Sequence, residues 1–558
     1  MVARRRYVAG VALTLALAVG ACGGGDSEPQ IEGAEGGGST IDAGGSTTTA
    51  VPVKADPTAI LRYGTMQATS LDPVKQGTPC ETGPLRLIYD TLTQWDENNR
   101  IAPMLAESWT LDSPTQLTLK LRSGVTFQDG TPFNADAVKF NLDRALNDPV
   151  STVKSLLYMV ESVEVVDPLT VRINMSMPAG GPLLSALADR AGMMVSPTAF
   201  QAAGSQEDFN RAPVGSGMYR VEGEWRPVES LSVRSWDGYW DTETPRLGGI
   251  DLTDVKVDAM VNAINADQMD LVVLDSTAQI PGVEGQKGTV VKVNAPAVPQ
   301  LRLFLLNATI PPLDDLRVRQ AIAHALDRDA IADVMTDGRA KGSTQWYPEG
   351  SMAYDEDFED PYPYDPDRAK QLLAEAGYPD GFELNAVVGS SSTSYVQQGE
   401  LIQGMLDDVG IKMNLERIDT AQMVPSVYGG GPNNRGSVLA APWGSSSTPD
   451  PDTIFRRVFL SDGLTNNGGD EIPGARELLD RAAASVDEEE RAELYQEISR
   501  LQAEGLYEGV VLFHVPAIMA MKDYVGGVEK ADVRCSATGS LRGVFITEGR
   551  VPATGPAE

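Results

Sequence analysis

The chain has 558 residues, of which 42% are hydrophobic, and 45 Lys and Arg against 78 Asp and Glu give a formal net charge of −33. A globular chain of this length is too long for one compact core, so we expect two or more lobes. The acidic balance argues against nucleic acid as a partner, because phosphate backbones bind basic surfaces.

The N-terminus has the pattern of a secretory leader. Arg4, Arg5 and Arg6 precede an apolar run over 8–19, and Gly20-Ala21-Cys22 follows. The run is too short to span about 30 Å of hydrocarbon. A membrane span needs about 18 apolar residues, and no other apolar stretch in the chain is that long. We therefore predict a signal peptide over 1–21 and a lipobox in which Cys22 is lipidated, holding the protein on the extracytoplasmic face of the cell membrane. A plain signal peptide with a chance Cys is the alternative.

Residues 22–51 are rich in Gly, Ser and Thr and poor in large apolar side chains. Such a segment cannot bury enough apolar area to offset its ordering entropy. We expect a flexible tether here, with the globular body beginning at about residue 52.

The body alternates short strands with amphipathic helices. We expect strands at 61–64 and 117–121, a helix over 135–146 capped by Asn134, and a hairpin over 163–173 that turns at Asp-Pro. Further along we expect one long helix over 317–335, a helix from Asp365-Pro366 to Gly377 and another over 487–504, with buried strands at 301–306 and 510–513. This mixture predicts α/β lobes.

Cysteine and histidine are scarce. Cys80 and Cys535 are the two cysteines after Cys22, and an oxidising compartment favours a disulfide between them. Two free buried thiols are the alternative. His324 and His514 are the two histidines, and the cysteines lack metal-ligand spacing, so we predict no metal and no cofactor.

Four stretches carry a family resemblance, in this order: 105–138, 213–219 with 238–240, 318–328, and 364–378. With them the chain resembles the extracytoplasmic solute-binding proteins of the peptide/nickel group of bacterial ABC importers. We expect most residues in these stretches to be structural, including Arg319 and Asp327, which we place on a helix in weak surface contacts.

The resemblance implies a two-lobed, periplasmic-binding-protein-like α/β clamp of the large type. Lobe I would comprise 52–300, with an extra subdomain over about 100–205, and the chain would return to it at 514–558. Lobe II would comprise 301–513. The hinge would lie near 300–307 and 510–517, and Cys80 and Cys535 would then share a lobe.

The resemblance also implies where ligand binds. In peptide-binding relatives a Trp-Gly segment followed by an acidic residue lines the pocket, and the acid holds the peptide's amine. Trp443 and Gly444 match, but Ser446 or Ser447 replaces that acid, and Asp450 is expected to form a turn and start a helix. A hydroxyl-rich loop suits a sugar, a modified peptide or another polar solute. The candidate ligand-binding residues are Thr69, Ser70, Trp346, Tyr347, Trp443, Gly444, Ser445, Ser446, Ser447, Asp450, Phe513 and His514. Core packing is the alternative for the aromatic members and for His514.

These features predict a substrate-binding lipoprotein that delivers a peptide or similar small polar solute to an ABC permease. We expect a monomer that is not an enzyme, so no catalytic residue is assigned. A solute sensor of the same fold is the main alternative. A secreted hydrolase is less favoured, because the chain has two histidines and no Gly-x-Ser-x-Gly elbow.

Overall fold

The structure is a computed structural model. It describes residues 54–65, 68–76, 82–96, 99–256, 259–274, 276–294, 300–390, 393–428, 439–446, 448–463, 465–466, 470–528 and 541–553. All of them belong to one compact unit, Ala50–Glu558. The predictions about the leader, Cys22, the tether and the Cys80–Cys535 disulfide fall outside the described residues.

The first lobe is built on a seven-stranded mixed sheet. Its order is β12 (Thr289–Asn294), β18 (Ala517–Lys522), β11 (Leu271–Leu274), β1 (Ile60–Gly64), β10 (Gly249–Thr253), β9 (Ser230–Ser235) and β8 (Tyr219–Val221). Side chains alternate across it: Leu271 and Val273 of β11 enter the core that contains α1 (Thr82–Ile88). Val272 and Leu274 enter the core that contains α6 (Met260–Asn265), as a strand buried on both faces requires.

A subdomain of this lobe has its own four-stranded antiparallel sheet. The order is β4 (Ala106–Ser113), β5 (Gln116–Leu121), β7 (Thr170–Met175) and β6 (Val160–Asp167). Residues of α2 (Ala135–Asn147) and α3 (Gly180–Leu187) share its apolar core. Asn134 caps α2, because its side chain accepts a hydrogen bond from the Ala137 N–H at 3.0 Å.

Smaller elements complete the first lobe. They are α4 (Pro197–Ala203), α5 (Gln206–Arg211), the pair β2 (Thr93–Trp95) and β3 (Ile101–Pro103), and the pair β19 (Val525–Gly526) and β20 (Phe545–Ile546).

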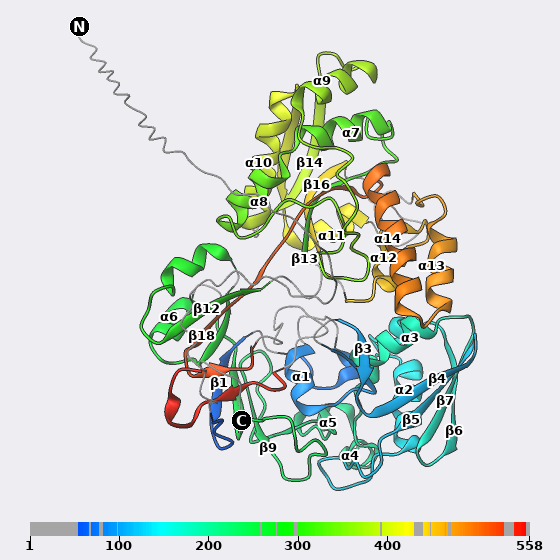
Figure 1. Cartoon of the computed structure of the whole chain (residues 1–558), viewed down its shortest axis with the longest axis vertical. Helices are drawn as coiled ribbons and strands as arrows, with labels where there is room; N and C mark the ends of the chain where they lie inside the picture. The colour runs from blue at the N-terminus through cyan, green and yellow to red at the C-terminus, as the bar shows by residue number, and fades with distance from the viewer. Residues whose placement is uncertain are drawn as a thin grey trace, which may run out of the picture. The chain divides into compact units, whose positions relative to one another are not determined.

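The second lobe is built on a five-stranded sheet ordered β15 (Ile411–Ile418), β14 (Phe382–Gly389), β16 (Ala440–Ser446), β13 (Gln300–Leu306) and β17 (Gly509–His514). Helices lie around it in Figure 1: α7 (Leu316–Ala325), α8 (Arg328–Thr336), α9 (Pro366–Glu375), α10 (Thr393–Asp408), α11 (Thr420–Tyr428), α12 (Asp452–Phe459), α13 (Ala475–Ala484) and α14 (Glu488–Gly505).

The alternation of β13 separates these helices into two groups. Phe304 and Leu306 pack in a core with residues of α7 to α10. Leu301, Leu303 and Leu305 pack in a core with residues of α12 to α14. Because side chains of a strand point alternately to opposite faces, the two helical groups cover opposite faces of the sheet.

The chain passes between the lobes through neighbouring strands. β12 pairs with β18 in the first lobe, and β13 pairs with β17 in the second. β17 ends at His514 and β18 begins at Ala517, so two residues separate the sheets on this connection. The architecture is the two-lobed α/β clamp that the family resemblance implies.

Two sequence predictions are wrong in the stretch 316–336. The expected single helix is two, because the backbone turns extended at Leu326 and the Asp327 side chain caps α8 by accepting from the Ala330 N–H at 2.9 Å. Arg319 is buried rather than superficial, and it donates to the main-chain carbonyls of Leu313 at 2.8 Å and Gly505 at 2.9 Å. None of the helices in the described ranges is long and apolar enough to span a bilayer.

Candidate ligand-binding site

Trp443 and Gly444 lie in β16, beside the first crossing strand. Gly444 pairs with Arg302 of β13, and a Cβ at this position would collide with the Tyr395 hydroxyl. The Arg302 guanidinium lies 4.1 Å from the Tyr395 ring centroid and donates to Ser394 Oγ at 2.9 Å. Glycine is therefore needed for the close approach of Tyr395 to the strand.

The serine run begins in the same strand. The backbones of Ser445 and Ser446 pair with Leu301 and Gln300. Ser447 lies outside the described residues.

Asp450 forms a buried ion pair. One carboxylate oxygen accepts from Arg491 of α14 at 2.6 Å and from the Ser185 hydroxyl of α3, and the other accepts from the Asp452 N–H at 2.9 Å. Burial alone would raise the pKa of Asp450, but the Arg491 charge and the donated hydrogen bonds hold that pKa below its ordinary value. The Asp452 contact forms the turn expected at this position, and the rest of the carboxylate joins α14 to α3.

Asp452 forms a second contact of the same kind. It accepts from the Tyr158 hydroxyl at 3.0 Å and from Arg456 Nε at 3.1 Å. Burial raises the pKa of Asp452 to about 6. Since Tyr158 and Ser185 belong to the subdomain, both acids connect the second lobe to the first.

Three of the predicted aromatic residues pack in the apolar interior of the second lobe. Trp346, Tyr347 and Phe513 are almost completely buried. The Trp346 ring meets Phe459 edge-on at 5.0 Å between centroids, and the Tyr347 hydroxyl donates to the Thr448 carbonyl at 3.1 Å. These contacts match the core-packing alternative.

The remaining predicted residues lie in turns or next to the second crossing. Ser70 is buried. Its hydroxyl accepts from the Asp72 N–H at 3.1 Å and donates to Asn210 Oδ1 at 3.2 Å, while Thr69 is exposed. His514 Nε2 lies 3.1 Å from the Gln345 carbonyl, and burial lowers the pKa of His514 to about 4. His514 is therefore neutral at physiological pH.

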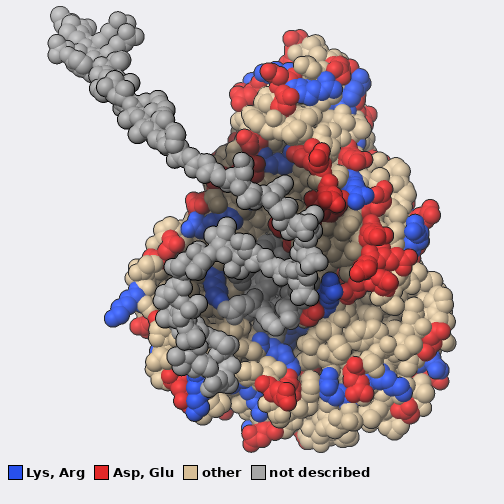
Figure 2. Space-filling view, in the orientation of Figure 1, with Lys and Arg blue, Asp and Glu red and all other residues tan. Residues whose placement is uncertain are grey.

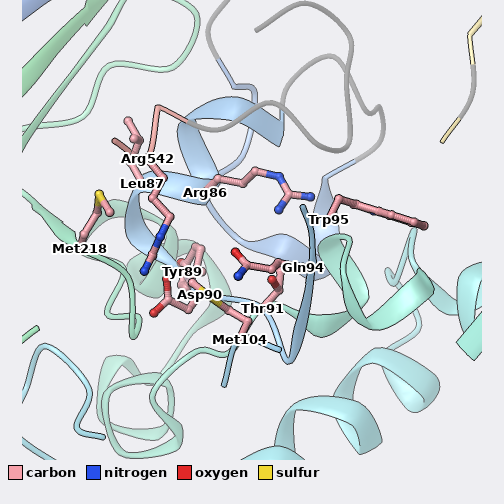
Figure 3. A pocket seen from close by; sticks show the side chains of 10 residues that line it. All are labelled: Arg86, Leu87, Tyr89, Asp90, Thr91, Gln94, Trp95, Met104, Met218 and Arg542. Carbon is pink, nitrogen blue, oxygen red and sulfur yellow. The ribbon is translucent and has the colours of Figure 1, made fainter. Parts of the chain in front are cut away.

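The structure has a separate pocket in the first lobe, and none of the predicted site residues lines it. Figure 3 shows its side chains, which come mainly from α1, from β2 and from the segment between them. The lining residues are Arg86, Leu87, Tyr89, Asp90, Thr91, Gln94, Trp95, Met104, Met218 and Arg542.

Two parts of this pocket differ in how their polar groups are satisfied. Arg542 donates to the Tyr239 hydroxyl at 2.5 Å and pairs with Asp241. Asp90 accepts from the Trp240 indole at 2.7 Å and from Tyr239 at 3.2 Å, and burial raises the pKa of Asp90 to about 6. On the other side, Arg86 Nε and Trp95 Nε1 are buried and have no acceptor among the residues that the structure describes.

Sequence reasoning missed this pocket. Arg86 stands between Leu85 and Leu87, two buried residues of α1, and this cation within an apolar helix was the available signal. Among the described residues, no cluster of three or more His, Cys, Asp or Glu could hold a metal ion.

A two-lobed α/β chain joined by paired crossing strands has the architecture of periplasmic solute-binding proteins. Residues 100–466 match the family model "Bacterial extracellular solute-binding proteins, family 5 Middle". The chain belongs to this family, and it is a solute-binding protein of the peptide/nickel type found in ABC importers.

A curated relative agrees with this assignment, and solved structures share the fold. The chain is 30% identical over 461 residues to the glutathione-binding protein GsiB of Salmonella paratyphi A, with 81% of this chain and 88% of that protein covered. The substrate binding protein CtaP of Listeria monocytogenes has a similar fold, with a TM-score of 0.77, 22% identity, and coverage of 88% of this chain and 100% of that one. DppA of Helicobacter pylori, solved with the peptide STSA, gives a TM-score of 0.70, 21% identity, and coverage of 88% and 98%.

Proposed function

We propose that this chain is the substrate-binding lipoprotein of an ABC importer, that it captures a peptide or similar small polar solute between its lobes, and that it delivers the solute to a membrane permease. The observation that carries the proposal is the pair of crossing connections, β12 to β13 and β17 to β18, in a chain of this family. The relatives support the ligand class, since one is named as glutathione-binding and another was solved with a peptide.

The crossings supply a hinge for closure. A solute that contacts both lobes favours the closed arrangement and shifts the population toward it. To move that population from about 1:99 to about 99:1, the solute must bind the closed state better by about 5.5 kcal/mol. No bond of the solute needs to break, so the solute leaves chemically unchanged.

The domain boundaries remain part of the proposal. Lobe I would comprise 52–300 and 514–558, and lobe II would comprise 301–513. The sheets agree with this division in one respect: β12 and β18 lie in one sheet and β13 and β17 in the other.

The anchor, the disulfide and the oligomeric state also belong to the proposal. Cys22 would carry the lipid that holds the protein on the outer face of the cell membrane, 22–51 would be its tether, and a Cys80–Cys535 disulfide would close lobe I. The protein would act as a monomer.

A thermal-shift screen of peptides, glutathione, sugars and nickel chelates tests capture. We expect at least one class to raise the melting temperature, and mass spectrometry to recover the compound intact. Cleaved products would contradict the proposal. In the cell, deletion of the gene should abolish uptake of the same compound, whereas unchanged uptake would exclude the transport role.

A further inference from the structure

We propose that the pocket of the first lobe binds the carboxylate of an acidic solute, with Arg86 as its cationic partner and the Trp95 indole as a second donor. The inference rests on the proposed function, because it names the chemistry of the solute that the clamp captures.

The first argument is the hydrogen-bond inventory of the pocket. Arg86 donates through one terminal nitrogen to the Ala188 carbonyl at 2.9 Å, and no described residue supplies an acceptor for its Nε. The Trp95 indole N–H is also buried, and it too has no acceptor within the described part of the chain. A buried donor without a partner costs about 1–3 kcal/mol. Other unsatisfied donors, such as Trp346 Nε1, lie in the packed core, whereas Arg86 and Trp95 line a pocket that a ligand with acceptors can enter.

The second argument is charge. None of the ion pairs formed among the described residues includes Arg86, whereas Arg542 in the same pocket pairs with Asp241. Asp189 is the neighbouring acid, and its Oδ1 lies 3.7 Å from Arg190 Nε. Its negative charge therefore acts on the Arg190 guanidinium as well as on that of Arg86. Burial and the neighbouring Arg190 charge both lower the pKa of Arg86, and Asp189 opposes them only in part. An anion at this position would relieve the cost of a partly buried cation.

The third argument is the arrangement of the two donors. Figure 3 shows the Arg86 guanidinium extending toward Trp95, with Gln94 below it, the Trp95 ring at the outer edge of the group and Arg542 extending toward Asp90. Gln94 Nε2 is engaged with the Pro103 carbonyl at 2.9 Å. A carboxylate has two acceptor oxygens and suits a guanidinium, which can donate two parallel bonds to it.

Matched probes test the inference without any mutation. Calorimetric titration would compare di- and tripeptides as free acids with the same peptides as C-terminal amides, and would include glutathione, succinate and neutral sugars. We expect the protein to bind free-acid peptides or dicarboxylates, and to bind the corresponding amides at least about 30-fold more weakly. The loss is of the size seen when one partner of a buried charge pair is removed.

Variants then locate the effect. Arg86→Gln should weaken binding of the acid by about 30-fold or more, and Arg86→Lys should recover part of that affinity. Trp95→Phe should weaken binding severalfold, because the variant lacks one N–H donor. Arg211→Gln, which removes the same charge from an exposed position on α5, should bind like the wild type. Trp95→Phe keeps the site testable if Arg86→Gln does not fold.

The outcomes separate the two proposals. If amides or neutral sugars bind as well as acids, or if Arg86→Gln binds the acid like the wild type, the carboxylate site is wrong and solute capture survives. If no probe binds and no solute co-purifies, solute capture fails and the carboxylate site fails with it.

Discussion

The sequence predicts that Asp450 forms a turn or contacts the ligand, and in the structure its carboxylate makes two sets of contacts within the protein. It makes the expected turn with the Asp452 N–H, and its buried carboxylate also holds Arg491 and Ser185. Breaking a buried pair is costly because one charge remains without its partner, whereas exposed pairs contribute little. The stability of the free protein therefore depends on Asp450.

Asp450→Asn should lower the free energy of unfolding by about 3–5 kcal/mol, because Arg491 would stay buried without a counter-charge. Urea unfolding followed by circular dichroism measures the change. The matched control is Asp462→Asn, whose partner Arg476 and whose own side chain are solvent-exposed, and which should change stability by less than about 1 kcal/mol. Equal effects of the two substitutions would contradict the buried-pair account.

The raised pKa of Asp90 predicts that the stability of the protein depends on pH. Burial raises the pKa of Asp90 from 3.8 to about 6, so between these values the folded state binds a proton that the unfolded state releases. Wild type should therefore gain stability relative to Asp90→Asn as the pH falls from 6 to 4, by about 2–3 kcal/mol. Denaturant titrations of both proteins across this range measure it. A constant difference would show that the carboxyl titrates normally.

At the residue scale, the sequence predicts what local chemistry decides. Asn134 was expected to cap a helix, and it does. Asp450 has a tertiary partner, Arg491, that lies 41 residues away, and no local pattern shows that pairing. Sequence reasoning misses Arg86 for the same reason: that its Nε has no acceptor among the described residues is visible only when α1, β2 and the Arg190 segment are brought together.

At the element scale, strands and well-capped helices follow the sequence closely. The expected strand at 117–121 is β5, Gln116–Leu121, and the expected helix at 487–504 is α14, Glu488–Gly505. The error at 317–335 arose because apolar spacing continues through Leu326 while Asp327 begins a new helix. Periodicity alone does not reveal a break when a capping residue restarts the same pattern.

The N-terminal turn of α3 is a contact between elements that can be tested with glycine. A Cβ at Gly181 would lie 2.5 Å from Arg491 Cζ, and Arg491 is held by Asp450, so it cannot move aside freely. Gly181→Ala should therefore lower the free energy of unfolding by about 1–3 kcal/mol.

Gly404 of α10 is the matched control, because nothing lies within 4 Å of the Cβ that would be added. Gly404→Ala should raise stability by about 0.5–1 kcal/mol, since alanine is the better helix former. Chemical unfolding of both variants measures the difference. A Gly181→Ala protein as stable as the wild type would show that α3 and α14 do not pack this closely.

At the scale of the whole molecule, each lobe is built around its own sheet, and the lobes meet where the second lobe contacts the subdomain of the first. Ala483 of α13 enters the core of the subdomain, and Asp450 and Asp452 reach Ser185 and Tyr158. Figure 2 shows acidic side chains gathered over the region of α13 and α14 on this face. The family resemblance predicts the two lobes, but the carboxylate site that we propose uses pocket residues that the family motifs do not include.

The central claim is that the protein captures a small solute and does not alter it. Native mass spectrometry of the protein purified from its own cells, followed by release of the bound compound, tests this claim most directly. The account predicts one small molecule per chain, bearing a carboxylate, with the same mass before binding and after release. A protein that carries nothing and binds none of the offered compounds, or one that returns them cleaved, would contradict it.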